Sequence, residues 1–299
     1  MTTAPRVSIG MPAFNLESAV GRAIESVTAQ TFRDFELIVS DNASTDGTEA
    51  VCRRYAAADP RIRYTRQAAP ITPFENFRFV LDAARAPYFM WLPADDYALP
   101  RLLERAVAVL EGRRDVVCCV PGVEFLDAGG QRWRSSGTFA LTGGLRDNVE
   151  RFLEDPRDNS RFYGLYRREI VRAVLPDAPY FAFDWVLSLA SLAHGKHWEL
   201  DDVLLVREAS DPARYMQLVD VLMRGRLARL LPLSAFTRTV LFGGLGVPLT
   251  PRALLRLLRL NVMFHIMYCR YRYPRYGRLA ERIGLRLRHL GTAASSRQH

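Results

Sequence analysis

Tyr88-Phe-Met-Trp-Leu-Pro-Ala-Asp-Asp-Tyr97 is the stretch from which the fold of this 299-residue chain can be worked out. Its short apolar run, bounded by Pro87 and Pro93, predicts a buried strand rather than a helix. Asp95 and Asp96 follow where that strand emerges, and ionised acids are costly to bury without a partner. Ligands of open α/β sheets bind at the carboxyl ends of strands. The acidic pair therefore suggests a hard divalent cation shared with substrate phosphates.

The same two acids have a simpler interpretation as the start of a helix. Leu99-Pro100 leads into a helical pattern from Arg101 to Leu110. Acidic side chains are common near a helix N-terminus, where they interact favourably with the helix dipole. The rest of the chain must decide between the two interpretations.

Strands and helices alternate along the first hundred residues. We expect strands at 6–11, 35–40, 61–65 and 88–92, separated by helices at 16–30, 48–58 and 73–85. This order predicts the α/β class, with a mostly parallel sheet flanked by helices. Asn15, Asp41 and the Asp95–Asp96 pair each follow a strand, so they would converge along one edge of the sheet.

Two common nucleotide-binding motifs are absent from the sequence. After the first expected strand the chain reads Gly10-Met-Pro-Ala-Phe-Asn15 instead of G-x-G-x-x-G, and G-x-x-x-x-G-K-[ST] does not occur. A row of acids does not suit bare phosphates unless a metal or a nucleobase comes between them. The sheet edge is therefore expected to bind a ligand that brings a metal ion or a nucleobase to these acids.

Three motifs, in order, resemble the opening of the family 2 glycosyltransferases, which are inverting, nucleotide-sugar-dependent enzymes of the GT-A fold. They are Val7-Ser-Ile-Gly-Met-Pro-Ala-Phe-Asn15, Ala23-Ile-Glu-Ser-Val-Thr-Ala-Gln-Thr-Phe32 and Phe35-Glu-Leu-Ile-Val-Ser-Asp-Asn-Ala-Ser-Thr-Asp-Gly-Thr48. Trp91-Leu-Pro-Ala-Asp-Asp96 resembles the D-x-D region of that family. The resemblance implies a GT-A domain over 1–210, with a nucleotide-sugar-binding half at 1–110 and an acceptor half with the catalytic base at 111–210.

The resemblance also implies which residues contact the nucleotide sugar. The candidates are Pro12, Ala13, Phe14, Asn15, Asp41, Asn76 and Asp95. Asp41 would bind the base, usually uracil, because a carboxylate accepts well from an imide N–H. The alternative for Asp41 is an Asx-turn residue, although Asp46 suits that role better, as a helix cap.

By the same resemblance, Asp95 and Asp96 would hold Mn²⁺ or Mg²⁺ on the diphosphate. One departure from the family pattern bears on this metal site. Many relatives carry Asp where this chain has Pro93, so the fuller D-x-D-D form is absent. The number of carboxylates that reach the metal therefore stays open.

Asp184 is the candidate catalytic base in the second half, within Tyr180-Phe-Ala-Phe-Asp-Trp-Val-Leu-Ser-Leu189. Relatives in the resembled family carry an acid before an aromatic at this place, where it acts as the base. Burial among the neighbouring aromatic side chains would raise the pKa of Asp184 toward that of a useful general base. The alternative is an N-cap role for a helix at 186–193.

The remaining pattern of the second half predicts further strands at 116–120, 123–126, 162–166 and 198–206. A hairpin return is expected at 132–137 and a helix at 148–153. His194 and His197 are spaced like a metal pair, but without a third ligand we interpret them as loop residues. Arg207 follows the last strand, where it would face either the diphosphate or solvent.

The C-terminal part, 211–290, is expected to be a basic helical extension, followed by a disordered tail at 291–299. The net charge is +9, and ten arginines stand against one acid, Glu281, between Arg252 and Leu290. Basic amphipathic helices with interleaved aromatics suit an anionic membrane surface. Packing on the core or on a second subunit, as in a homodimer, is the alternative. Nucleic acid is not expected as a partner, because no recognised binding motif accompanies the charge.

The composition of the chain indicates where in the cell the protein is expected to lie. No apolar run reaches 18 residues, so we expect no transmembrane helix. The N-terminus resembles a strand rather than a signal peptide. The four cysteines show no C-x-x-C spacing or disulfide framework, which favours free thiols. A cytoplasmic protein, peripheral on the inner face of the cell membrane, fits these features.

The sequence thus predicts a metal-dependent inverting glycosyltransferase. It would move a sugar from a nucleoside-diphosphate sugar, usually UDP-linked, to a hydroxyl of a glycan or lipid-linked glycan. Two other classes stay open. A sugar nucleotidylyltransferase would share the sheet and the metal, but it should carry a Gly-rich basic loop after the first strand. A non-catalytic, membrane-associated scaffold would keep the fold and lose the chemistry.

Overall fold

The computed structural model describes residues 4–209, 219, 222, 228 and 231–273. The strands are β1 (Val7–Ala13), β2 (Phe35–Asp41), β3 (Ile62–Arg66), β4 (Tyr88–Trp91), β5 (Tyr97–Ala98), β6 (Val116–Leu126), β7 (Arg132–Arg134), β8 (Leu165–Arg167) and β9 (Lys196–Glu208). The helices are α1 (Glu17–Thr28), α2 (Thr48–Ala58), α3 (Pro73–Asp82), α4 (Leu102–Gly112), α5 (Leu145–Glu154), the 3₁₀ turn η1 (Ser160–Tyr163), α6 (Arg168–Val174), α7 (Phe183–Ser191), α10 (Ser234–Phe242) and α11 (Pro251–Arg272).

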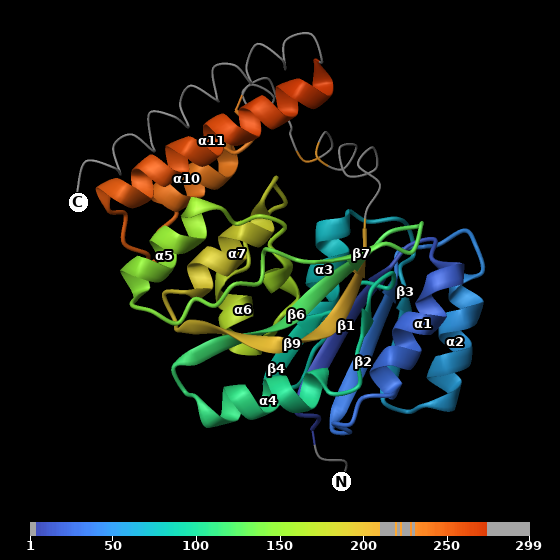
Figure 1. The fold of residues 1–299 in the computed structure, drawn as a ribbon. Helices are drawn as coiled ribbons and strands as arrows, with labels where there is room; N and C mark the ends of the chain where they lie inside the picture. Colours follow the sequence, from blue (N-terminus) through green and yellow to red (C-terminus); the bar gives the residue numbers. More distant parts are fainter. Residues whose placement is uncertain (1–3, 210–218, 220–221, 223–227, 229–230, 274–299) are drawn as a thin grey trace.

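All these strands belong to one sheet in the order β3-β2-β1-β4-β8-β6-β9-β5, with β7 paired to β6 (Figure 1). The strands β3, β2, β1 and β4 run parallel to one another, as the alternating pattern of the first hundred residues predicts. From β8 onward the sheet is mixed, because β8 lies antiparallel between β4 and β6. The predicted α/β fold with a helix-flanked sheet is confirmed.

Helices cover both faces of this sheet. Apolar side chains of α1 and α4 pack into one cluster on the first face, and those of α3, α6 and α7 join another on the opposite face. Strands β1 and β2 are therefore buried along their whole length, which explains their nearly continuous apolar sequence. Gly10 has a particular role here, because a Cβ at this position would lie 2.6 Å from Val80 Cγ2 of α3.

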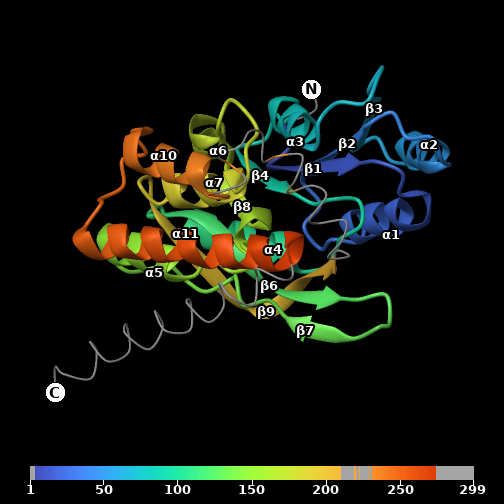
Figure 2. The ribbon, with the colours of Figure 1, turned by 90° about the horizontal axis from the view of Figure 1, so that it is seen from above.

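A third apolar cluster joins the second half of the chain to the C-terminal helices. It combines residues of α5 and α7 with residues of α10 and α11. Thr250 caps α11 and also donates from its hydroxyl to Glu150 of α5, over 2.6 Å. Figure 2 shows α11 lying along α5. The described part of the basic extension therefore packs on the core, which was one of the expected alternatives, and the division at residue 210 stays a prediction.

Parts of the C-terminal expectation lie outside the described residues. These parts are most of 210–230 and all of 274–299, including the expected disordered tail. None of the helices in the described ranges is long and apolar enough to cross a membrane.

Several local expectations for the second half were wrong. The predicted strand at 162–166 is instead η1 followed by β8, and the two predicted strands at 116–120 and 123–126 form one strand, β6, with register shifts against β9. The short elements β5 and α6 were not predicted. His197 lies buried in β9 rather than in a loop.

Candidate active site

Asp41 ends β2 and is held by three donors. Its Oδ1 accepts from the backbone N–H of Ser44 at 2.9 Å, and its Oδ2 accepts from Tyr64 Oη and Arg66 Nη1, each at 2.9 Å. Burial alone would raise the pKa of this carboxyl, but hydrogen bonds from Ser44, Tyr64 and Arg66 outweigh burial and keep the pKa below its usual value. Asp41 is therefore a fixed, ionised acceptor with no exposed surface.

The loop after β1 lies beside Asp41. Pro12 and Ala13 are the last residues of β1, where Ala13 pairs with Asp41, and Phe14 is 42% exposed. Asn15 has a positive φ of 52°, a conformation that asparagine tolerates better than most residues. Its side-chain oxygen accepts from the backbone N–H of Thr45 at 2.8 Å. Asn15 therefore ties the loop after β1 to the loop after β2.

Asn76 lies in α3 and is buried against β2. Its Oδ1 accepts from Ser40 Oγ, and its Nδ2 donates to the Ser40 carbonyl at 3.1 Å. In this structure the amide joins α3 to the strand that carries Asp41. Any contact of Asn76 with a nucleotide sugar stays a prediction.

Asp96 lies in the turn after β4 and is 2% exposed. Its Oδ2 accepts from Arg207 Nε at 3.1 Å, and its Oδ1 accepts from the backbone N–H of Glu208 at 2.9 Å. Burial raises the pKa of Asp96 to about 7, and the guanidinium of Arg207 opposes that rise. Arg207 therefore lies at the site, inside the protein, and not in solvent.

Asp95 differs from its neighbour in its surroundings. Its carbonyl oxygen accepts from Arg22, whereas its carboxylate has no hydrogen-bond or ion-pair partner within the described part of the chain. A partly exposed carboxylate suits a hard cation such as Mn²⁺ or Mg²⁺, which prefers oxygen ligands. The Asp95 side chain thus fits a metal, whereas Asp96 fits one only if its contact with Arg207 changes. No cluster of three His, Cys, Asp or Glu side chains suited to a metal occurs among the residues that the structure describes.

Asp184 lies in the first turn of α7. The helix begins at Phe183 and its N-cap is Ala182, so the N-cap alternative for Asp184 was wrong. Its Oδ2 accepts from Asn159 Nδ2 at 2.8 Å. Burial raises the pKa of Asp184 above its usual value, while the bond from Asn159 and the nearby charge of Arg207 favour the ionised form.

Tyr163 and Arg207 connect the acids of the two halves. The guanidinium carbon of Arg207 lies 4.1 Å from the centre of the Tyr163 ring. Burial raises the pKa of Tyr163 to about 12, and the charges of Asp96, Asp184 and Asp95 add to that rise. The three carboxylates therefore lie near enough to Tyr163 to affect its ionisation, and one of them, Asp96, pairs with Arg207.

The end of β1 joins this acid cluster to the Asp41 region. The N–H of Asn42 donates to the Ala13 carbonyl at 2.8 Å, and the N–H of Ala94 donates to the Pro12 carbonyl at 3.3 Å. The turns after β2 and β4 thus flank the loop after β1, as expected for the carboxyl ends of parallel strands. Asp41 lies on one side of this loop and Asp95 on the other.

Sequence reasoning missed Asn159, Ser160 and Tyr163 as members of the site. Asn159 bonds to Asp184, and Ser160 Oγ accepts from Arg207 Nη1 at 3.3 Å. The only sequence signal was the very polar run 155–161 directly before an aromatic pair. Nothing in that run indicates which residue faces Asp184.

His197 is not part of a metal site. Its Nδ1 lies 3.3 Å from Arg161 Nη1 and its Nε2 lies 2.9 Å from Ser191 Oγ. Because Arg161 can only donate, Nδ1 must accept, and Nε2–H donates to Ser191. Burial lowers the pKa of His197 well below its usual value, so the ring is neutral.

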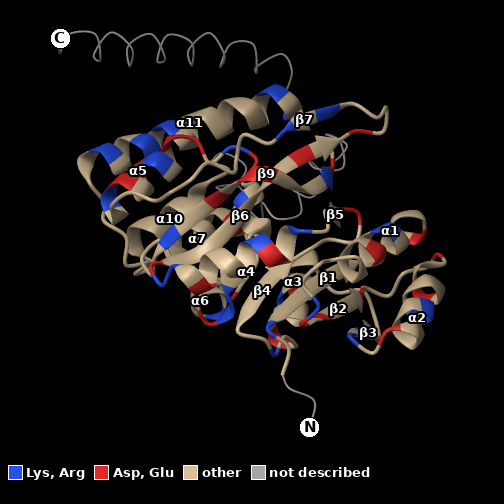
Figure 3. Ribbon diagram, turned by 60° about the horizontal axis from the view of Figure 1, so that its bottom comes forward, with Lys and Arg blue, Asp and Glu red and all other residues tan. Residues whose placement is uncertain are grey.

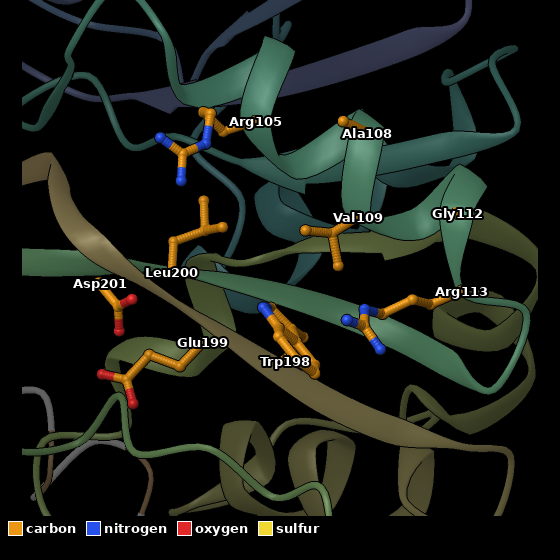
Figure 4. A pocket seen from close by; sticks show the side chains of 9 residues that line it. All are labelled: Arg105, Ala108, Val109, Gly112, Arg113, Trp198, Glu199, Leu200 and Asp201. Carbon is orange, nitrogen blue, oxygen red and sulfur yellow. The ribbon is translucent and has the colours of Figure 1, made fainter.

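A surface depression of about 690 Å³ lies elsewhere, between α4 and β9 (Figure 4). Arg105 of α4 and Arg113, which follows α4, line one side of it. Trp198 and Asp201 of β9 line the other side. Its lining includes none of the candidate site residues. The depression therefore lies apart from Asp41, Asp95 and Asp184.

Solved structures with the same fold support the GT-A architecture. The chain is similar to the crystal structure of S. aureus TarS residues 1–349 in complex with UDP-GlcNAc, with a TM-score of 0.57 at 15% identity over 88% of this chain and 81% of that one. It is also similar to the mannosyltransferase PcManGT from Pyrobaculum calidifontis, solved with GDP-Man and Mn²⁺, with a TM-score of 0.52 at 17% identity over 95% of this chain and 88% of that one.

Among curated relatives, the putative glycosyltransferase EpsE of Bacillus subtilis is 33% identical over 133 residues, which are 44% of this chain and 48% of that protein. The GalNAc(5)-diNAcBac-PP-undecaprenol beta-1,3-glucosyltransferase of Campylobacter jejuni is 35% identical over 107 residues, 34% of this chain and 35% of that protein. The matched segments thus span half or less of these relatives. The family model described as glycosyl transferase family 2 matches residues 8–175, more than half of the chain. The chain belongs to glycosyl transferase family 2.

Proposed function

We propose that this protein is an inverting glycosyltransferase that uses a nucleoside-diphosphate sugar, most suitably a UDP-sugar. The observation that carries the proposal is that Asp95, Asp96 and Asp184 all lie near Tyr163, with Asp96 paired to Arg207. This arrangement combines carboxylates suited to a cation, a fixed positive charge and a partly buried candidate base. Asp41 adds a fixed carboxylate acceptor across the loop after β1.

Asp184 would act as the general base. It takes the proton from an acceptor hydroxyl while that oxygen forms a bond to the anomeric carbon. The bond from the anomeric carbon to the diphosphate oxygen breaks on the opposite face, and its electron pair leaves with the nucleoside diphosphate. Burial raises the pKa of Asp184, which makes the carboxylate a stronger base than an exposed aspartate.

The charges that develop on the leaving diphosphate require positive partners. Arg207 supplies a permanently charged guanidinium, held at the site by Asp96 and stacked on Tyr163. Asp95, with Asp96, would hold Mn²⁺ or Mg²⁺, and the metal when bound supplies Lewis-acid stabilisation of the diphosphate. PcManGT, solved with GDP-Man and Mn²⁺, has the same fold, which supports a divalent ion here.

Asp41 would select the nucleobase. The Asp41 carboxylate would accept the imide N–H of a base such as uracil in exchange for one of the donors that fill it in this structure, which come from Ser44, Tyr64 and Arg66. Asp95 would contact the sugar and ribose side of the donor. Pro12, Ala13, Phe14 and Asn15 would form the loop over the nucleotide, and Asn76 would support it through Ser40.

The acceptor would be a hydroxyl of a glycan or a lipid-linked glycan. The Campylobacter jejuni relative is named for an undecaprenol-linked substrate, which supports this class. The outer face of α11 suits such an acceptor, because Leu254, Leu255 and Leu258 are exposed on a helix that also carries several arginines (Figure 3). We propose that this face binds the anionic inner surface of the cell membrane.

The other two classes have less support. A sugar nucleotidylyltransferase would need a Gly-rich basic loop after β1, whereas this loop reads Pro12-Ala-Phe-Asn15. A scaffold that kept the fold without the chemistry has no need to place a partly buried ionisable group such as Asp184 near two further acids, Asp95 and Asp96. Turnover decides between a scaffold and an enzyme.

The test is release of UDP from UDP-glucose, UDP-galactose, UDP-GlcNAc and UDP-GalNAc in the presence of MnCl₂. We expect turnover with at least one donor, and we expect Asp184→Asn to lower kcat by roughly 100- to 10,000-fold with unchanged UDP affinity. Asp115→Asn is the matched control, since Asp115 pairs with Lys196 at the opposite end of β6. If no donor binds or turns over in the wild type, the enzyme proposal fails.

A further inference from the structure

Asn159 connects two side chains on the same face of α7. Its Nδ2 donates to Asp184 Oδ2 at 2.8 Å, and its Oδ1 accepts from Ser188 Oγ at 3.1 Å. Asp184 and Ser188 are four residues apart, so they are neighbours on one helix face. The amide of Asn159 therefore lies across the first turn of α7.

This arrangement fixes the orientation of the amide. An ionised carboxylate can only accept, so it must face the NH₂ group of Asn159, and the Ser188 hydroxyl then meets the amide oxygen. Asn159 is 1% exposed and Ser188 is fully buried. Water is therefore excluded from competing for these two hydrogen bonds.

The backbone of Asn159 is fixed as well. Asn159 has a positive φ of 46°, a conformation that Asn, Asp and Gly adopt most readily. The preceding residue, Asp158, accepts from Ser135 Oγ at 2.8 Å. Two residues after Asn159, Arg161 is fully buried and donates from Nη2 to the Phe139 carbonyl at 2.7 Å. The segment that carries the amide is thus held on both sides.

Asn159 is also the only described side chain that hydrogen-bonds to the Asp184 carboxylate. The other groups that face this carboxylate act through charge or through the backbone. They are Arg207 from β9, Tyr163 from η1, and the backbone N–H groups of Asp184 and Trp185. Loss of the amide would leave the orientation of the carboxylate to its own rotamers.

We propose that Asn159 is a positioning residue for Asp184, and that Ser188 sets the orientation of the Asn159 amide. The amide holds Oδ2, so that the second oxygen, Oδ1, is presented to the acceptor hydroxyl. This inference rests on the proposed role of Asp184 as the base. It assigns the run 155–161 a function in catalysis that its polarity alone does not indicate.

The amide also moderates the basicity of Asp184. Burial favours the protonated acid, and a hydrogen bond to the charged form favours the carboxylate. Without Asn159 the pKa of Asp184 should therefore rise further. At neutral pH a larger fraction of the molecules would then hold a protonated base that cannot accept the acceptor proton.

The test uses full-length protein with two variants and a control. Asn159→Gly removes the amide while tolerating the positive φ, and Ser188→Ala frees the amide oxygen with little change in volume. Asn148→Ala is the control, because Asn148 is a buried asparagine of α5 whose amide bonds only to Gly143. Titration of Asp184 is followed by NMR of aspartate ¹³Cγ-labelled, metal-free protein, with the resonance assigned by its loss in Asp184→Asn.

We expect the pKa of Asp184 to rise in Asn159→Gly, to rise less in Ser188→Ala, and to stay at the wild-type value in Asn148→Ala. With the UDP-sugar that turns over fastest, kcat should fall roughly tenfold or more in Asn159→Gly. The acid limb of its pH profile should move to higher pH, and the donor KM should stay unchanged.

A folded Asn159→Gly protein with the wild-type pKa and pH profile would overturn the inference. If Asn159→Gly does not fold, as judged by circular dichroism, Ser188→Ala decides on the same two measurements. A different result tests the underlying function. If Asp184→Asn retains full transfer activity, the base assignment fails, whereas the NMR titration still reports whether Asn159 controls the carboxylate.

Discussion

Arg207 Nε lies 3.1 Å from Oδ2 of Asp96; the Asp96 side chain is almost fully buried and that of Arg207 is 15% exposed. Arg207 comes from the end of β9, 111 residues after Asp96 in the turn that follows β4. The ion pair therefore joins the parallel half of the sheet to the mixed half at the candidate site. A buried pair is strongly destabilising when one partner is removed, because the other charge is left uncompensated.

The pH dependence of stability should reveal the state of Asp96. Burial raises its pKa to about 7, above the value of about 3.9 expected in the unfolded chain. Between these values the folded state keeps a proton that the unfolded state has lost. The contribution of Asp96 to stability therefore decreases as pH rises from about 4 to 7.

Asp96→Asn removes this titration, so the difference in unfolding free energy between Asp96→Asn and wild type should shift in favour of the variant by roughly 1 to 4 kcal/mol as the pH rises from 5 to 8. Urea unfolding at the two pH values measures the difference. Asp202→Asn, which alters an exposed pair with Arg105, should show no such trend. The opposite trend in Asp96→Asn would mean that attraction by Arg207 dominates and the folded pKa is low.

Metal dependence should follow Asp95 more than Asp96. The Asp95 carboxylate has no partner within the described residues, whereas both oxygens of Asp96 accept hydrogen bonds. In Asp95→Asn we expect Mn²⁺ to lose its enhancement of UDP binding, with UDP affinity in EDTA unchanged. Isothermal titration with and without MnCl₂ measures both quantities.

Glu124→Gln serves as the control for this experiment, because Glu124 lies in β6 and pairs with Arg132 on the hairpin. It should respond to Mn²⁺ like the wild type. If Mn²⁺ still enhances UDP binding fully in Asp95→Asn, Asp95 does not hold the metal. Asp96 would then be the next residue to substitute.

The first half of the fold could be predicted from sequence because its signals are local. Short apolar runs define β1 and β2, which continue to Ala13 and Asp41, and these strands are buried on both faces. Parallel alignment then places the strand ends, and with them the candidate residues, on one edge of the sheet. Local pattern and overall topology agree in this region.

The second half was harder because tertiary contacts decide its local structure. Phe162 belongs to an aromatic run with high strand propensity, but its ring stacks on Trp91 with centroids 4.5 Å apart, and the backbone forms η1 instead. The burial of Arg161 between His197 and the Phe139 carbonyl is equally invisible to periodicity. Asn159 could not be found because its partner, Asp184, is 25 residues away.

Base selectivity should depend on Asp41. The imide N–H of uracil is a donor at the position where cytosine has only an acceptor nitrogen, so a carboxylate acceptor favours UDP over CDP. Asp41→Asn presents either an oxygen or an NH₂ group and should lower the ratio of UDP to CDP affinity by roughly tenfold. Competition titrations with the two nucleotides measure this ratio.

Asp59→Asn is the matched control for base selectivity. Asp59 is the C-cap residue of α2 and pairs with an arginine, Arg61, but it does not follow the carboxyl end of a strand. Its ratio of UDP to CDP affinity should match that of the wild type. Equal ratios for Asp41→Asn and wild type would remove Asp41 from base recognition, even if both nucleotides bind more weakly.

Membrane binding should depend on the outer face of α11. Leu255 and Leu258 are 66% and 61% exposed, and both lie opposite the residues that pack on α5. Replacing both with Glu removes apolar surface and adds negative charge. We expect a roughly tenfold or larger loss of binding to phosphatidylcholine vesicles that contain phosphatidylglycerol. Co-sedimentation at low and high salt measures the loss.

The control for this surface is Trp133→Glu, which makes the same kind of change at a 43% exposed side chain on β7. It should leave vesicle binding unchanged, because β7 belongs to the hairpin at the sheet rather than to α11. If the wild-type protein does not bind anionic vesicles, or binds them as well at high salt as at low salt, electrostatic attachment is excluded. Loss of vesicle binding in both variants would instead indicate that any exposed apolar side chain supports binding. The acceptor would then have to reach Asp184 without a membrane contact from α11.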